Sequence, residues 1–342
     1  MTILVIGGVA LDITATVARS TPTLSALLHT SNPGRMTQTL GGVGRNVCEA
    51  AMRAGARASL LSVVGDDLAG KSIQQGMQEL GMSTAFIHEM PGKTSAIYNA
   101  IHASDGQLLA AVADMDIFDC LTSDQIVAAL KVRPSLSCFD GNLSTQAMTD
   151  IASTAKEHGI PLFFEPTSIP KSRKVFDHAE SVLSGVIRFV SPNDYELKAM
   201  SQAALEQLPS RRTPILQRSP SFEKAPAGVQ ALLSHAVRLS NYFPHVITKL
   251  GREGCLYVGQ TQGICHVDYL AAEPVDPTAI HSVTGAGDTF VGAVLAHLDK
   301  HGGEPEPADA KAWRAILKQG QRAAVLTLQS SLAVSPRIQP SL

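Results

Sequence analysis

The sequence predicts an α/β fold built on a doubly wound, mostly parallel sheet. Short apolar runs rich in Val, Ile, Leu and Phe recur along the 342 residues, and stretches with helical periodicity separate them. Such alternation is typical of parallel strands that are connected by helices on both faces of a sheet. Ligands of these sheets bind at the carboxyl ends of the strands, so residues that follow each run are the first functional candidates.

The individual elements follow from the apolar runs and from the helix-stop signals. Two stretches, Ser144–His158 and Thr289–His301, have helical periodicity, and each is followed by a glycine. The predicted strands are Ile3–Ile6, Ala58–Val64, Leu136–Phe139, Leu162–Phe164, Val186–Val190 and His245–Leu250.

Two segments depart from this alternation. Residues 94–103 and 107–113 are extended runs joined by Ser104-Asp105-Gly106, and Asp-Gly is a strong hairpin signal, so we expect a β-hairpin lid near residues 94–113. Residues 201–228 are proline-rich with little periodicity, which indicates an exposed insertion. No repeat or linker divides the chain, and we expect one domain over residues 1–342.

The composition excludes several classes of function. Lys and Arg number 28 against 30 Asp and Glu, a net charge of −2, so the chain lacks the basic excess that nucleic-acid binding requires. The five cysteines form no C-x-x-C pair and are expected to be reduced thiols. With neither a basic leader nor an apolar run long enough for a bilayer, we expect a cytoplasmic protein without membrane partners.

The most informative motif is the glycine-rich stretch from Ser282 to Phe290, which precedes a predicted helix. Gly285 and Gly287 allow a tight turn, and the free amides at the helix start, those of Gly285, Ala286 and Gly287, suit an anion such as a phosphate. Asp288 would repel that anion unless it accepts a proton from an attacking hydroxyl. A helix whose first turn carries a favourable Asp fits these residues equally well.

Two N-terminal features indicate a polar ligand. Gly41 and Gly42 open a predicted helix that carries Asn46, whose amide both donates and accepts hydrogen bonds. Asp12 follows the first strand, where a carboxylate can accept bonds from two sugar hydroxyls. An ordinary glycine-rich turn and a solvated loop Asp are the alternative explanations.

Two further segments suit a nucleotide and its metal. Asn193 and Glu196 follow a predicted strand and project together from a helix start, where they can hold hydrated Mg²⁺ through water. Thr248, Gly251 and Gly254 lie in a turn where Thr248 can bond a phosphate. A plain helix cap explains the first pair as well, and ordinary hairpin chemistry explains the second set.

Residues 65–72 match the P-loop pattern G-x-x-x-x-G-K-S literally. Asp66 and Asp67 would place two negative charges where the loop amides must enclose phosphates. We therefore interpret the match as coincidental and predict that Lys71 does not bind nucleotide.

These motifs, in this order and spacing, resemble the ribokinase or phosphofructokinase-B family of sugar and nucleoside kinases over nearly the whole chain. The resemblance implies a ribokinase-like, three-layer α/β fold with a small β lid, and it identifies residues 65–70 as a family segment outside the ATP site. Residues 41–46, 111–117 and 140–142 are most similar to those of pseudouridine kinases.

The resemblance implies a role for each motif in transferring phosphate from ATP to the 5′-hydroxyl of pseudouridine. Asp288 would be the base, the 285–287 amides an anion hole, and Asn193 with Glu196 would organise Mg²⁺. Nucleotide contacts would come from Asn193, Thr248, Gly251, Gly254, Gly285 and Gly287. Substrate contacts would come from Asp12, Gly41, Gly42, Asn46, Thr94, Tyr98, Asn99 and Asn142.

Some alternatives remain open at this stage. The same chemistry on ribose, adenosine or fructose fits the motifs, and so does a silent sugar-binding or nucleoside-binding regulatory protein. Ser282 stands where many family members carry an Asp that helps hold a monovalent cation, so K⁺ activation is open to question. A small-molecule substrate is the expected partner, and a homodimer is one assembly open to the chain.

Overall fold

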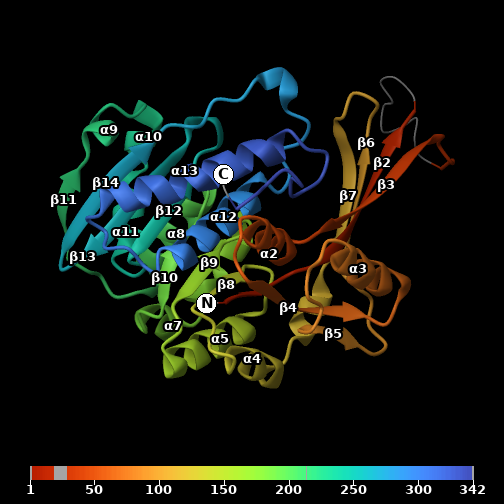
Figure 1. Cartoon of the computed structure of the whole chain (residues 1–342), viewed down its shortest axis with the longest axis horizontal. Coiled ribbons are helices and arrows are strands. Elements are labelled where there is room, and N and C mark those ends of the chain that lie inside the picture. The colour runs from red at the N-terminus through yellow and green to blue at the C-terminus, as the bar shows by residue number, and fades with distance from the viewer. Residues whose placement is uncertain (1, 19–28, 213, 341–342) are drawn as a thin grey trace.

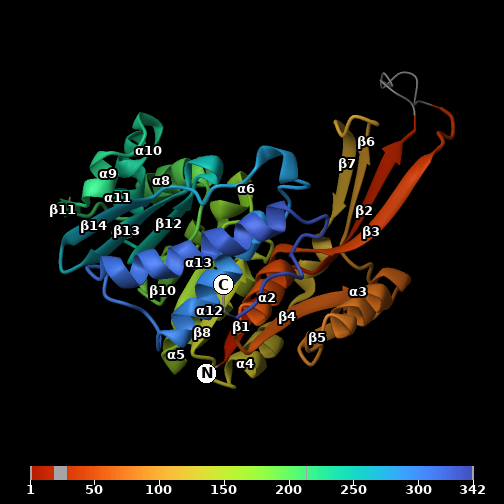
Figure 2. The same cartoon turned by 45° about the horizontal axis from the view of Figure 1, so that its top comes forward.

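The computed structural model describes residues 2–18, 29–212 and 214–340, which form a large sheet flanked by helices and a projecting smaller sheet (Figures 1 and 2). The large sheet is mostly parallel, as the sequence predicts, with the antiparallel pairs β12–β13 and β13–β14 towards one edge. Its ten strands are, in spatial order, β11 (Ile215–Arg218), β14 (Ile264–Leu270), β13 (Cys255–Thr261), β12 (His245–Lys249), β10 (Ile187–Val190), β9 (Leu162–Glu165), β8 (Leu136–Asp140), β1 (Ile3–Ile6), β4 (Ala58–Gly65) and β5 (Ile87–Met90).

Helices cover both faces of this sheet because its strands are apolar on both sides. In β1, Ile3 and Val5 pack into one core, while Leu4 and Ile6 pack into the other. The first core lies under α2 (Val43–Arg53), α3 (Leu68–Glu79), α12 (Ala286–Lys300) and α13 (Ala310–Leu328). The second core lies mainly under α4 (Ser123–Leu130), α5 (Thr145–His158), α8 (Asp194–Gln207) and α11 (Leu233–Ser240).

The smaller sheet contains the hairpin that the sequence predicts as a lid, and it has four strands rather than two. The predicted hairpin is β6 (Ile97–His102) and β7 (Leu108–Asp114), and β2 (Ala10–Val17) with β3 (Gly34–Gly41) extends it in the order β3-β2-β6-β7. Asp12 therefore lies within a lid strand instead of in a loop after β1. Figures 1 and 2 both show this sheet projecting from the body of the molecule beside α2 and α3.

The close packing of α2 against α12 joins the two ends of the chain. Gly292 makes it possible, since a Cβ there would lie 2.5 Å from the Val47 carbonyl oxygen and 2.6 Å from the Ala50 Cβ. Small residues at such a crossing let two helix backbones approach more closely than the usual 8–10 Å between axes. The N-termini of both helices consequently meet at one edge of the sheet.

The exposed insertion expected near residues 201–228 is largely regular structure. Its first residues complete α8, Ile215–Arg218 forms the edge strand β11, and α9 (Pro220–Glu223) and α10 (Ala227–Ala231) follow. Phe222 and Val229 are buried in the core. Short elements separated by prolines leave too few residues for a periodic pattern, which explains why sequence periodicity does not reveal them. Among the described residues, no helix combines the length and apolar character needed to cross a membrane.

The P-loop look-alike does not form an anion site. Asp67 caps α3, and its carboxylate accepts the Gly70 amide at 2.7 Å, the Ser95 amide at 2.8 Å and the Ser95 hydroxyl at 2.6 Å. The loop thus supplies its own carboxylate where a phosphate would have to sit.

We predict that Lys71→Ala leaves ATP affinity unchanged, as measured by calorimetry, because Lys71 is exposed and outside any anion site. Asp67→Ala should lower the free energy of unfolding by about 2 kcal/mol through loss of its hydrogen bonds, as measured by urea titration. The neighbouring exposed Asp66→Ala is the matched control, with a change of less than about 0.5 kcal/mol. Loss of ATP binding in a folded Lys71→Ala variant would restore the P-loop interpretation.

Candidate active site

The N-terminus of α12 presents free amides beside a buried carboxylate. Gly285 adopts a left-handed conformation (φ 75°) before the helix, where a Cβ would collide with the Ala333 carbonyl. No described residue accepts a hydrogen bond from the amides of Gly285, Gly287 or Asp288. Burial raises the pKa of Asp288, while the Asn46 side chain and the charges of Lys249 and Arg45 oppose the shift. This arrangement suits an anion next to a proton acceptor.

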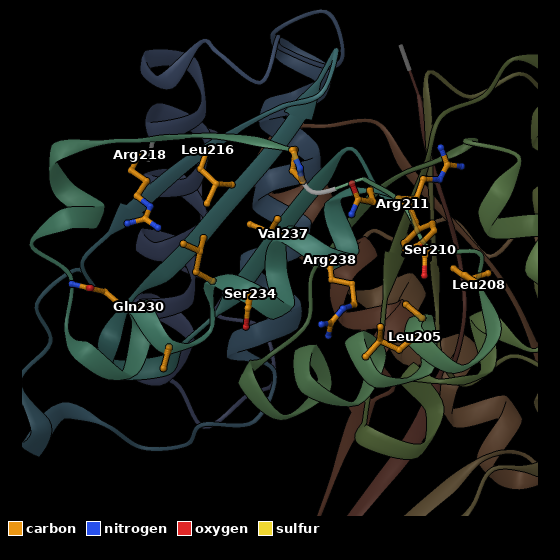
Figure 3. A pocket seen from close by; sticks show the side chains of 16 residues that line it. Leu205, Leu208, Ser210, Arg211, Leu216, Arg218, Gln230, Ser234, Val237 and Arg238 are labelled. Atoms are coloured by element: carbon orange, nitrogen blue, oxygen red, sulfur yellow. The ribbon is translucent and has the colours of Figure 1, made fainter.

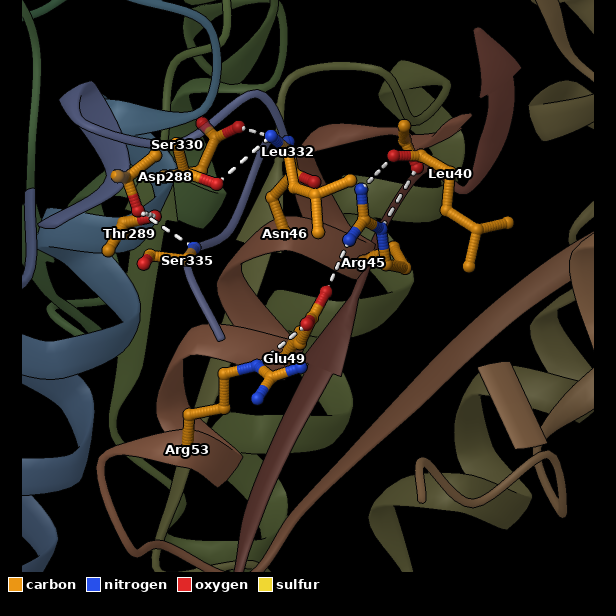
Figure 4. Close-up of polar contacts among 12 residues, drawn as sticks. Leu40, Arg45, Asn46, Glu49, Arg53, Asp288, Thr289, Ser330, Leu332 and Ser335 are labelled. Carbon is orange, nitrogen blue, oxygen red and sulfur yellow. Dashed lines mark hydrogen bonds and ion pairs between the residues drawn. The ribbon is translucent and has the colours of Figure 1, made fainter. Parts of the chain in front are cut away.

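Asn46 connects the N-terminal motif to this carboxylate. Its side-chain amide donates to Asp288 Oδ2 at 2.7 Å, and its Oδ1 is buried without a partner among the described residues (Figure 4). Asn46 follows Gly42, which precedes α2 with φ 93°. A buried carbonyl oxygen without a donor is costly unless a ligand supplies one. Asn46 Oδ1 is therefore suited to accept a hydrogen bond from a ligand hydroxyl.

Asp12 lies close to the same place on the lid. A Cβ at Gly41 would collide with the Asp12 carboxylate, so strand β3 passes directly against it. Burial raises the pKa of Asp12 to about 6, with Arg45 opposing the shift and Asp288 adding to it. The Arg45 guanidinium is itself buried, donates to the carbonyls of Leu40 and Gly41, and forms an ion pair with Glu49 (Figure 4).

Asn142 lies next to the loop that follows β1. Its backbone amide donates to Asp140 Oδ1 at 2.9 Å, and Asp140 Oδ2 accepts the Gly8 backbone amide at 2.8 Å. The Asn142 side-chain oxygen accepts from Lys171 Nζ at 2.6 Å. Burial raises the pKa of Asp140, and these hydrogen bonds oppose the shift. The network fixes the carboxyl ends of β1 and β8 relative to each other.

A cavity of about 530 Å³ has Asp288 in its lining, and neither Asn46 nor Asp12 is among the residues that line it. Its polar lining includes Lys249, Glu165 and Glu196, and one wall is apolar. Apolar and glycine lining residues include Val275, Ile280, Phe290, Ala324, Leu328, Gly251 and Gly254. A pocket of this volume with an apolar wall and a charged end fits a nucleotide, with its base against the wall and its phosphates towards α12.

Lys249 provides the positive charge at this end of the cavity. Its ammonium bonds both oxygens of Glu165, at 2.9 and 2.8 Å, and lies 3.7 Å from the position that a Gly287 Cβ would occupy. Burial alone would lower the pKa of Lys249, but Glu165 and Glu196 outweigh it and keep the lysine charged. Burial raises the pKa of Glu165, and Lys249 opposes that shift.

Asn193 and Glu196 form a capping box at the start of α8. Asn193 Oδ1 accepts the amides of Tyr195 and Glu196, and Glu196 Oε2 accepts the Asn193 amide at 2.8 Å. The side-chain oxygen of Asn193 therefore already accepts two hydrogen bonds. Glu196, with a second carboxylate oxygen, is the better metal ligand of the two. No group of three acidic, His or Cys side chains that could enclose a metal occurs in the described ranges. Carboxylates at the phosphate end fit hydrated Mg²⁺ that is shared with phosphates.

The structure gives the surroundings of three further expected contacts. Thr248 is fully buried and does not line the cavity, whereas its strand neighbour Lys249 does. Tyr98 pairs in register with Asp12 and shares its face of the lid, so Asn99, the next strand residue, points to the opposite face. Thr94 is exposed and precedes β6.

Sequence reasoning missed Glu165, Asp140 and Lys249 as site residues. Glu165 and Asp140 come directly after the predicted strands 162–164 and 136–139, where the carboxyl-end rule could have found them. Lys249 gave no such signal because it lies inside a predicted strand.

Comparison with known proteins agrees with this architecture. Residues 2–339 match the pfkB family carbohydrate kinases. A pseudouridine-metabolizing bifunctional protein of Schizosaccharomyces pombe is 30% identical over 98% of this chain and 47% of its own length. The pseudouridine kinase of Escherichia coli is 30% identical over 51% of this chain and 54% of its own. This chain thus spans about half the length of these two relatives.

The solved structure of Arabidopsis thaliana ribokinase with ribose and ATP superimposes with a TM-score of 0.74, covering 97% of this chain and 95% of that one at 16% identity. The resemblance in fold spans both the main sheet and the lid. With a family match along almost its entire length, the chain belongs to the pfkB family of carbohydrate kinases.

Proposed function

We propose that this protein transfers the γ-phosphoryl group of ATP to the 5′-hydroxyl of pseudouridine. The observation that carries the proposal is the Asp288 carboxylate, which lies at a helix N-terminus with free amides, between a nucleotide-sized cavity and Asn46. The relatives described as pseudouridine-metabolizing and as a pseudouridine kinase support the choice of substrate.

In the proposed reaction, Asp288 takes the proton of the 5′-hydroxyl as its oxygen attacks the γ-phosphorus of ATP in line. The bond from that phosphorus to the bridging oxygen breaks, and ADP leaves. The free amides of Gly285 and Gly287 stabilise the charge on the transferring group, and Lys249 adds a positive charge beside them. The Ala286 amide, expected to join them, already donates to the Val283 carbonyl at 3.4 Å. The raised pKa of Asp288 strengthens it as a base near neutral pH.

Substrate and nucleotide would be held on opposite sides of Asp288. Asp12, Asn46 and the backbone at Gly41 and Gly42 would bind the ribose hydroxyls, with Tyr98 on the same lid face and Asn142 below. Gly251 and Gly254 would line the nucleotide. The lid would exclude water and limit hydrolysis of ATP.

Mg²⁺ would be organised by Glu196 through water, with Asn193 fixing the orientation of that carboxylate. When bound, the ion neutralises charge on the phosphates of ATP. Glu165 would hold Lys249 towards the phosphate end of the cavity until the nucleotide enters.

We expect Asp288→Asn to lower kcat about 1000-fold, because no base remains to take the hydroxyl proton, while nucleoside affinity changes less than about threefold. Rates from a coupled ADP assay and affinities from calorimetry measure the two effects. Asp299→Asn, at the far end of the same helix, is the matched control and should keep its kcat. Near-normal turnover by Asp288→Asn would remove the catalytic assignment.

Nucleoside affinity should weaken as the pH falls through about 6, because Asp12 must be ionised to accept bonds from two hydroxyls and its pKa is raised to about 6. Calorimetry without ATP between about pH 5 and about pH 8 isolates this binding step. Asp12→Asn should bind about 10-fold to 100-fold more weakly and lose the pH dependence. Unchanged affinity and pH profile in Asp12→Asn would contradict the ribose role.

A kinase assay with ATP across pseudouridine, uridine, adenosine, ribose and fructose tests the substrate. Pseudouridine carries an additional ring N–H donor that uridine lacks, and a site built to bind that donor should favour it by about 10-fold or more in kcat/KM. A higher kcat/KM for another compound would reassign the substrate. Binding without turnover of any of them would indicate a regulatory protein.

A further inference from the structure

A second cavity of about 530 Å³ lies away from the active site, between α8, β11, α10 and α11 (Figure 3). Its floor is apolar and is built from α8, β11 and α11. The floor residues include Ala204, Leu208, Leu216, Leu233 and Val237. Three arginines line the same cavity, and none of the described lining residues is acidic. The site residues of the proposed kinase reaction leave this cavity unused.

The three arginines are only partly engaged by the protein. In the view of Figure 3, Arg238 lies between Arg218 and Arg211. Arg238 donates to the neutral Ser201 hydroxyl at 2.7 Å, and Arg211 lies over the Tyr242 ring, 5.7 Å from its centroid. Arg218 has a loose, exposed pairing with Glu223 at 3.8 Å. Most of this positive charge therefore remains available to an anion.

The positive charge near the cavity also acts on a neighbouring histidine, His235. His235 lies one turn before Arg238 and contacts the Ser201 hydroxyl. Burial lowers the pKa of His235, and the charges of Arg238 and Lys198 lower it further. His235 does not itself line the cavity, and its ring contacts the same Ser201 hydroxyl that accepts from Arg238. The cavity combines partly paired arginines with apolar lining residues.

We propose that this cavity binds a small phosphate monoester with a planar or apolar body, of the size of a nucleoside monophosphate. Arginine forks match phosphate oxygens bidentately, and Tyr242 with the Leu and Val side chains offers an apolar surface to the rest of the ligand. The cavity volume falls within the range of small-molecule sites. Neither inorganic phosphate nor an uncharged nucleoside satisfies both parts of the site.

Helix α8 connects this cavity to the active site. Its first turn carries Glu196 at the nucleotide cavity, and Ala204 and Leu205 near its other end line the arginine cavity. Glu196 and Ala204 are eight positions apart, which corresponds to about 12 Å along a helix axis. A ligand in the arginine cavity would therefore contact the element that positions Glu196 and Asn193.

Calorimetry and hydrogen–deuterium exchange with uridine 5′-monophosphate test the proposal on the full chain. We expect exchange to slow at residues 214–218 and 227–242, in addition to any protection near Asp288. Phosphate alone and uridine alone should leave the exchange rates of residues 214–218 and 227–242 unchanged. Protection confined to the lid and the α12 N-terminus would overturn the proposal, and so would equal protection by uridine.

The double variant Arg211→Glu with Arg218→Glu should weaken binding at this cavity about 100-fold and abolish the protection of β11 and α11. Its cooperative thermal unfolding should match that of the unmodified chain, which shows that it is folded. Arg57→Glu, at an exposed arginine outside the cavity, is the charge-reversal control and should bind normally. Undiminished protection in the double variant would overturn the assignment. Because no arm measures pseudouridine turnover, failure here is separate from failure of the proposed kinase reaction.

Discussion

The approach of α2 to α12 is the constraint on which the site depends. Asn46 comes from the first sixth of the chain and Asp288 from the last, and their hydrogen bond exists because Gly292 lets the two helices pack backbone to backbone. A larger residue at position 292 would separate the helix N-termini, and the carboxylate would lose the donor that opposes its raised pKa. The small residues at the contact of α2 with α12 thus influence the pKa of Asp288.

Electrostatic compensation repeats this logic around Asp288. Asp288 raises the pKa of both Asp12 and Glu165, and Glu196 adds to the shift of Glu165. The cations Arg45 and Lys249 oppose these shifts. Arg45 lies towards the lid and Lys249 towards the nucleotide cavity. Each cation is fixed by its own acid, Glu49 or Glu165, so the charges are in place before any ligand arrives.

Much of this arrangement could be predicted from sequence, for identifiable reasons. The strand Ile3–Ile6 is apolar on both faces, and the helix after Gly285 has a clear periodicity, so both agree with the structure. Strand β3 escaped prediction because it is largely exposed and lacks an apolar pattern. Strand β2 does alternate apolar and polar residues, so its sequence carried a strand signal that went unused. Neighbouring residues in a strand also cannot be told apart without its register, which is why Lys249 was missed beside Thr248 and why Asn99 was placed with Tyr98.

The junction between lid and body shows how stiff this attachment is. Strand β3 ends at Gly41 and α2 begins at Val43, while the Arg45 guanidinium grips the last two carbonyls of the strand. A flap tethered in this way cannot swing freely at that corner. Any opening movement of the lid must therefore bend β2, β6 and β7 where they leave the body. The pivot of that movement lies at Arg45, the residue directly before Asn46.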